Sequence, residues 1–165
     1  MKPGALPAGR AWVFGDNIDT DAMAPSAYLM QAPETAVAHC MESIDAEFAG
    51  KVHAGDIFVA GANLGIGSSR ENAPFNLQQL GIRALLAKSY ARIFYRNALN
   101  LGLLALICPH TDRISDGDSL RVDPLAGRVH NLSSGDDLNC EPIPDHLLQM
   151  VHDGGLLAHL KMRSG

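Results

Sequence analysis

The chain of 165 residues is 47% apolar and 19% charged and carries a formal net charge of −5, which predicts one domain with a sizeable buried core. The acidic balance and the lack of a basic block argue against nucleic acid as a partner, because phosphate binding needs clustered Lys and Arg. No segment has the apolar length of a membrane span, and residues 1–10 lack the apolar centre of a signal peptide, so a soluble cytoplasmic protein with no membrane contact is expected.

The first elements predicted along the chain are a strand, a polar turn and a helix. The strand covers residues 11–14, and the turn, residues 15–25, is rich in Asp, Asn and Thr. Residues 33–43 have apolar and small side chains at helical spacing, with a proline at the start. Residues 56–60, DIFVA, predict a buried strand, and the glycine-rich segment 61–74, GANLGIGSSRENAP, follows it directly.

Strands and helices then alternate. A helix is expected at residues 70–80, with Gly81 as its stop, and a buried strand at 82–87. A second helix at residues 90–100 and a third strand at 103–107 follow. This alternation predicts an α/β fold with a parallel sheet and right-handed crossovers.

The pattern changes after the last of these strands. Two alternating runs around Pro-Leu-Ala-Gly predict a hairpin at residues 118–131, and the tail at 145–161 is helical, with a break at the glycine pair 154–155. No linker marks a domain boundary. Residues 1–165 are therefore predicted to form a single domain, in which residues 109–165 add a β-hairpin and a C-terminal helical extension.

The three cysteines are Cys40, Cys108 and Cys140. They are widely spaced and include no C-x-x-C pair, so we expect no zinc or iron–sulfur site built by this chain alone. The thiols are expected to be small buried or half-buried groups.

The glycine-rich segment predicts an anion site, because it joins a buried strand to the N-terminus of a helix. A dinucleotide-binding loop has a third glycine where this chain has Ser68, Ser69 and Arg70. A P-loop has a lysine, and residues 52–87 contain none. Neither nucleotide-binding hypothesis fits.

A third hypothesis is a site for carboxylate binding and proton transfer. The guanidinium of Arg70 suits a carboxylate, and the hydroxyls of Ser68 and Ser69 lie beside helix-end amides that stabilise an oxyanion. The alternative is purely structural: a serine caps the helix, Glu71 favours its first turn, and Arg70 is solvated. The residues alone leave both open.

Three segments together resemble a known family. Residues 15–25 (GDNIDTDAMAP), 61–74 (GANLGIGSSRENAP) and 87–104 (AKSYARIFYRNALNLGLL) occur in this order and at this spacing in the small subunits of 3-isopropylmalate dehydratase and homoaconitase, which correspond to the swivel domain of aconitase. The resemblance covers roughly residues 11–130. It implies a three-layer β/β/α swivelling domain, whose second β layer the strand and helix pattern does not predict.

The resemblance implies a hydro-lyase that isomerises a 2-hydroxy diacid through an alkene intermediate. The reaction expected first is that of 3-isopropylmalate to 2-isopropylmalate in leucine biosynthesis. Homoaconitase, citramalate dehydratase and dimethylmalate dehydratase are alternatives within the family, and a stand-alone anion-binding module is the alternative outside it. A separate large subunit would carry a [4Fe–4S] cluster, and the small subunit would be active only with that partner.

The family's site residues map onto the motifs of this chain. Ser68 would be the base that takes the proton alpha to a carboxylate. Ser69 and Arg70 would hold a substrate carboxylate. Thr20 and Asp21, from the first motif, would lie at the edge of the active site and contact the substrate, whereas the structural alternative keeps Asp21 as a turn former.

The segment Tyr28, Leu29 and Met30 is expected to set substrate specificity, because in this family it faces the variable end of the substrate. A tricarboxylate would need a cation there, and residues 21–50 contain no Lys or Arg. An apolar segment instead suits an isopropyl group. The alternative is that these residues belong to the core or to a subunit interface.

Three departures from the family pattern flank the serines. Ile66 stands where Cys is common, Leu64 where Phe is common and Asn72 where His is frequent. Because they lie beside the serines, they bear on the subfamily more than on the reaction.

Overall fold

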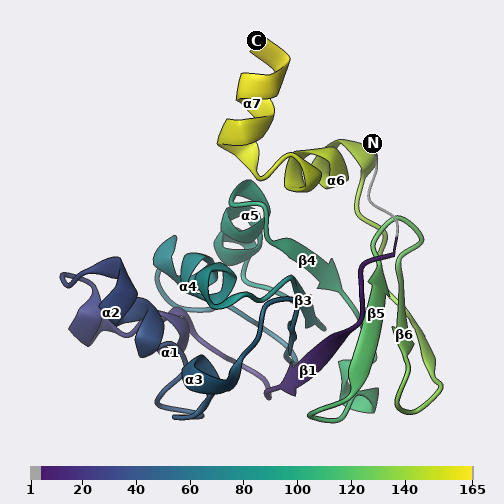
Figure 1. Ribbon diagram of the computed structural model, residues 1–165, viewed down its shortest axis with the longest axis horizontal. Coiled ribbons are helices and arrows are strands. Elements are labelled where there is room, and N and C mark those ends of the chain that lie inside the picture. The colour runs from purple at the N-terminus through teal and green to yellow at the C-terminus, as the bar shows by residue number, and fades with distance from the viewer. Residues whose placement is uncertain (1–4, 165) are drawn as a thin grey trace.

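A seven-stranded mixed sheet organises residues 5–164, the part of the chain that this computed structural model describes (Figure 1). The strands are β1 (Gly9–Val13), β2 (Ile57–Val59), β3 (Ala84–Ala87), β4 (Leu104–Ile107), β5 (Ser119–Asp123), β6 (Arg128–Asn131) and β7 (Asp137–Asn139). Their order is β4-β3-β2-β1-β5-β6-β7. The first four are parallel, and β5 to β7 continue antiparallel.

The helices lie between and after these strands. They are α1 (Thr20–Met23), α2 (Pro33–Ala38), α3 (Phe48–Lys51), α4 (Asn72–Leu80), α5 (Arg92–Asn100), α6 (Asp145–His152) and α7 (Leu156–Ser164), with the 3-10 turns η1 (Ser26–Tyr28) and η2 (Thr111–Arg113). Within residues 5–164, no helix has both the length and the apolar character needed to cross a membrane.

Strand β1 joins the two kinds of sheet. Its residues from Ala11 onward pair in parallel with β2, whereas Gly9 and Arg10 pair antiparallel with β5. A Cβ at Gly9 would lie 2.1 Å from the carbonyl oxygen of Gly55, so only glycine fits at this position. The central strand thus belongs to both halves of the molecule.

Two cores, one on each face of the parallel strands, make the molecule three-layered. In β2, Phe58 packs into the core beneath the helices, whereas Ile57 and Val59 pack into the core beneath the antiparallel strands. This is the two-residue alternation of a β-strand. The antiparallel strands supply four side chains to the second core: Leu120, Val122, Val129 and Leu138. The β/β/α architecture implied by the family resemblance is confirmed.

Helices α4 and α5 cover the helix side of the parallel strands. Ala73 and Leu77 of α4 and Phe94 and Ala98 of α5 are buried in that core. As predicted, α4 ends at Gly81, whose φ of 108° is the left-handed conformation of a C-terminal cap.

The helix predicted at residues 33–43 is shorter than expected. Helix α2 ends at Ala38, and the chain then turns so that Met41, at φ 66°, donates its backbone N–H to the carbonyl of Ala22. Cys40 and Met41 are fully buried. The burial of these two residues ends the helix although the helical spacing of apolar residues continues, and local periodicity does not reveal such tertiary packing.

Strand β7 was not predicted, although the predicted hairpin contains β5 and β6. Its sequence is Asp-Leu-Asn, and only Leu138 is buried. Such a short polar strand has no sequence pattern of its own, because it exists through its pairing with β6.

The C-terminal helices contact α5 through glycine backbone. A Cβ at Gly155, in the turn between α6 and α7, would lie 2.4 Å from the carbonyl oxygen of Asn100. A Cβ at Gly102 would lie 2.7 Å from the carbonyl carbon of Gly154. Helix α6 is therefore seated against the end of α5, and α7 extends away from the sheet (Figure 1).

This contact can be tested with matched glycine substitutions. Gly135→Ala is expected to cost about 1 kcal/mol, because its φ of 82° is left-handed but nothing lies within 4 Å of an added Cβ. Gly155→Ala is expected to cost roughly 1–3 kcal/mol more, because the Cβ also overlaps the backbone of α5. Urea denaturation measures both. Equal costs for the two variants would contradict the proposed backbone contact.

Candidate active site

Three loops meet at the carboxyl ends of the parallel strands β1, β2 and β3, the edge at which open α/β sheets bind ligands. The glycine-rich loop after β2 lies in the middle. Asp19 pairs with Ile66 on one side, and Leu64 pairs with Tyr90 on the other, in parallel bridges. The glycine-rich loop is thus fixed on both sides by backbone hydrogen bonds.

Polar side chains of the first loop fix the start of the second. The carboxylate of Asp16 accepts a hydrogen bond from the N–H of Ala62 at 2.7 Å. The side-chain amide of Asn63 donates to Oδ1 of Asn17 at 2.9 Å. Both asparagines are left-handed, at φ 58° and 61°, a conformation that Asn tolerates better than most residues. These pairings physically connect the first and second motifs.

The glycines of the loop allow close contact with the surrounding helices. At Gly65, with φ 90°, a Cβ would lie 2.1 Å from the ring of Phe94 on α5. At Gly67, with φ 111°, it would lie 3.0 Å from Oγ1 of Thr20 on α1. Side chains at these positions would push the following serines away from the first loop.

The predicted residues Ser68 and Thr20 are brought together. Their hydroxyl oxygens are 3.3 Å apart, and either can be the donor. Thr20 is only 2% exposed, whereas Ser68 and Ser69 lie on the surface. The structure therefore presents two adjacent exposed serines, and the hydroxyl of one of them, Ser68, is hydrogen-bonded to the hydroxyl of the buried Thr20.

Arg70 and Asp21 form an ion pair. Nη1 of Arg70 donates to Oδ1 of Asp21 at 3.1 Å and to the carbonyl of Ala24 at 3.0 Å. Nη2 and Nε of this guanidinium donate to no acceptor within residues 5–164. Asp21 also accepts from the N–H of Ser26 at 3.0 Å. That N–H first, and then Arg70, hold the pKa of Asp21 below its ordinary value of 3.8.

The backbone around the serines provides further donors. The N–H groups of residues 68–72 donate to no acceptor in the described part of the chain, and they lead into the N-terminus of α4. Such a series of free donors at a helix start attracts an anion. The alternative in which a serine caps this helix is not observed, because Glu71 is the N-cap residue and makes no side-chain capping bond.

The three residues of the expected specificity segment have different surroundings. Tyr28 stacks on His39, with ring centroids 3.9 Å apart, and partial burial followed by Glu42 raises the pKa of its hydroxyl. Leu29 is half-buried against the helix-side core, and Met30 is 97% exposed. They do not form one apolar cluster in this chain.

The departures from the family pattern are also placed. Leu64 is fully buried and Ile66 half-buried, so both are part of the loop's packing. Asn72, the first residue of α4, is exposed and lines a cavity of about 270 Å³ together with Glu71, Phe75 and Leu101.

Sequence analysis did not predict a hydrogen bond that joins α4 to α1. Asn76 is 1% exposed and donates from its side chain to the carbonyl of Met23 at 3.1 Å. An asparagine in a helical pattern that is otherwise apolar on that face is the only sign of it in the sequence.

The cysteines do not fit an iron–sulfur cluster. Cys40 lies in the helix-side core, and Cys108 and Cys140 lie in the second core. All are buried free thiols. Within residues 5–164, no group of three His, Cys, Asp or Glu side chains is arranged to hold a metal ion.

Comparison with known proteins gives consistent matches. A family model described as the aconitase C-terminal domain matches residues 16–111. The 3-isopropylmalate dehydratase small subunit of Methanosarcina acetivorans is 46% identical over 93% of this chain and 95% of its own length. The small subunit 1 from Archaeoglobus fulgidus is 49% identical over 93% of this chain and 96% of its own.

Solved structures agree. The crystal structure of 3-isopropylmalate dehydratase from Methanocaldococcus jannaschii has a TM-score of 0.90 at 43% identity, covering 95% of this chain and 94% of that one. Aconitase X from Thermococcus kodakaraensis has a TM-score of 0.52 at 15% identity, a likeness of fold alone.

The ion pair predicts a specific titration of Asp21. Its carboxyl should titrate below 3.8, and Arg70→Met should raise that pKa only part of the way, because the N–H of Ser26 remains. Because the pKa of Asp21 is lower in the folded than in the unfolded chain, its carboxylate stabilises the fold at pH values above the unfolded pKa, and this stabilisation is lost as the pH falls through the folded pKa. Solvent screening keeps the stabilisation small at this exposed pair. Carboxyl carbon NMR measures the titration. A pKa at or above 3.8 in the unsubstituted protein would contradict this pairing.

Proposed function

The chain belongs to the family of 3-isopropylmalate dehydratase small subunits, and we propose that it is the small subunit of a hydro-lyase that converts 3-isopropylmalate to 2-isopropylmalate in leucine biosynthesis. Identity of 46–49% with relatives of that name, over 93% of the chain, carries the proposal. The positions of Ser68, Ser69 and Arg70 support the roles given to individual residues. We expect the chain to act as one domain in the cytoplasm.

Ser68 is the proposed base. Its oxygen takes the proton from the carbon alpha to a substrate carboxylate while the hydroxyl leaves the neighbouring carbon, giving an alkene. Return of the proton and of the hydroxyl group to the exchanged carbons, together one water, gives the isomer. A serine hydroxyl is a weak base, so its deprotonated form needs donors. The hydroxyl of Thr20, 3.3 Å away, and the free N–H groups of residues 68–72 supply them.

Arg70 and Ser69 are the proposed carboxylate ligands. Nη1 of Arg70 is engaged by Asp21 and by the backbone, which leaves Nη2 and Nε to form a two-point contact with a substrate carboxylate. Asp21 is ionised and would repel that carboxylate. We therefore propose that Asp21 positions Arg70 and does not itself bind the substrate carboxylate.

A partner chain is needed to complete this site. Ser68 and Ser69 are on the surface, whereas abstraction of a proton from carbon by a serine oxygen requires an environment that excludes water. We propose that a large subunit covers the loop edge and carries a [4Fe–4S] cluster, for which the cysteines of this chain are unsuited. When bound, such a cluster supplies a Lewis acid for the leaving hydroxyl.

The segment Tyr28 to Met30 remains the proposed contact for the alkyl group. Residues 21–50 contain no cation to receive a third carboxylate. Met30 is 97% exposed and is therefore free to contact a substrate held between two subunits.

The role of Ser68 can be tested in the complex reconstituted anaerobically with its large subunit. Ser68→Ala is expected to lower kcat roughly 10²- to 10⁴-fold, because it removes the base. Ser134→Ala, which changes an exposed serine in the turn between β6 and β7, is the matched control and should leave kcat unchanged. Turnover by Ser68→Ala within a few-fold of the unsubstituted complex would exclude Ser68 as the base.

Substrate choice gives a separate test. The complex should have a kcat/KM for 3-isopropylmalate roughly tenfold or more above that for homocitrate. Met30→Lys should narrow this ratio by adding a cation, and Met30→Gln should not. A preference of the unsubstituted complex for the tricarboxylate would contradict the proposed role of this segment.

A further inference from the structure

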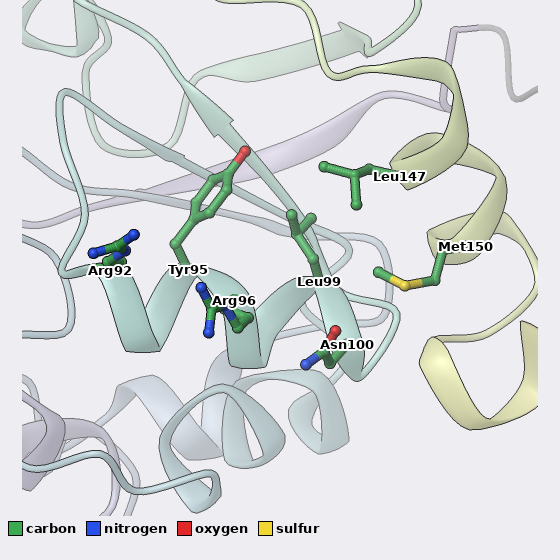
Figure 2. A pocket seen from close by; sticks show the side chains of 7 residues that line it. All are labelled: Arg92, Tyr95, Arg96, Leu99, Asn100, Leu147 and Met150. Carbon is green, nitrogen blue, oxygen red and sulfur yellow. The ribbon is translucent and has the colours of Figure 1, made fainter.

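A cavity of about 270 Å³ lies between α5 and α6, and neither the proposed reaction nor the family match gives it a role. Figure 2 shows it from close by. Its lining comes from α5 and α6: Arg92, Tyr95, Arg96, Leu99, Asn100, Leu147 and Met150.

One wall of this cavity is cationic. Arg92 and Arg96 are one helical turn apart, so their side chains leave α5 on the same side. Both are exposed, and neither forms an ion pair or hydrogen bond with any residue from 5 to 164. Two like charges at this spacing destabilise a helix unless an anion lies between them.

Tyr95 and Asn100 also line this space, and neither side chain makes a hydrogen bond with another described residue. Glu141 is an acidic residue that acts on one lining side chain, Tyr95. It contributes, after burial, to the raised pKa of Tyr95, but it makes no ion pair with either arginine. The cations are therefore not neutralised from within the described chain.

The opposite wall is apolar. Leu147 and Met150 extend from α6 toward Leu99 of α5 (Figure 2). Leu99 and Met150 are buried, and Leu147 is half-buried. A ligand in this cavity would therefore meet charge on one side and hydrocarbon on the other.

We propose that the cavity between α5 and α6 is a binding site for a small aliphatic carboxylate. The guanidinium groups of Arg92 and Arg96 hold the carboxylate, and Tyr95 and Asn100 donate further hydrogen bonds. The branched or linear alkyl part packs against Leu99, Leu147 and Met150.

The lining distinguishes this ligand from two similar ones. An amino acid carries an ammonium group, and none of the lining residues is an Asp or Glu that could neutralise it. A sugar phosphate suits the arginines but would place its hydroxyls against leucine and methionine side chains. A carboxylate with a hydrocarbon tail matches both walls.

A ligand at this site would contact both helices and add to the packing of Met150 and Leu147 of α6 against the core that contains Leu99 of α5. An occupied cavity would hold α6 on α5 more firmly. Amide hydrogen exchange in α6 should then slow when the ligand is present.

The experiment is calorimetric titration of the full chain with 4-methylpentanoate, with leucine and inorganic phosphate as comparison ligands. We expect 4-methylpentanoate to bind more tightly than either. The Arg92→Gln/Arg96→Gln double variant should weaken binding roughly tenfold or more. Arg121→Gln, which changes an exposed arginine on β5 outside the cavity, is the control for loss of a surface arginine and should bind as the unsubstituted chain does.

Three results would overturn the proposal. The first is that 4-methylpentanoate does not bind at millimolar concentration. The second is that Arg121→Gln weakens binding of 4-methylpentanoate as much as the double variant does. The third is that the large subunit abolishes this binding and that the double variant associates more weakly with the large subunit. The last result would assign the arginines to the subunit interface. The titration measures binding without turnover, so its result does not depend on whether Ser68 is the base.

Discussion

The structure of the site depends on the backbone pairing of the glycine-rich loop with the loops on either side of it. Asp19 opposite Ile66 and Leu64 opposite Tyr90 extend the order of the parallel sheet beyond the ends of its strands. This pairing requires a close approach, which glycine permits at Gly65 against the ring of Phe94. The serines that follow are thus placed by a rigid frame, although they lie on the surface.

The layered fold explains why the polar residues gather at one edge. Both faces of the parallel strands are buried, by helices on one side and by antiparallel strands on the other. Chemistry is therefore confined to the strand ends, where three successive loops bring their side chains together. Two side-chain hydrogen bonds cross between the first two loops, one between Thr20 and Ser68 and one from Arg70 to Asp21.

The sequence predicted the elements that are determined by neighbouring residues and the site residues that lie in long family motifs. The buried strands and the Gly81 cap can be predicted from the sequence, because an apolar run and a glycine at a helix end are local patterns. Strand β7 and the end of α2 at Ala38 are not readable, because pairing with β6 and the burial of Met41 decide them. For the site, the motifs indicated Ser68, Ser69 and Arg70, whereas the ion pair of Arg70 with Asp21 is seen only in the three-dimensional structure, because the two residues are far apart in the sequence.

The position of β1 has a consequence for how the chain is made. β1 is the first strand in the described sequence and lies in the centre of the sheet, yet β2 and β5, its neighbours on either side, are synthesised later. During translation one edge of β1 can pair as soon as β2 has emerged, whereas the other edge stays unpaired until β5, in the last third of the chain, has left the ribosome. Such long-range pairing slows folding, and it leaves one edge of the central strand open to aggregation until most of the chain has been made.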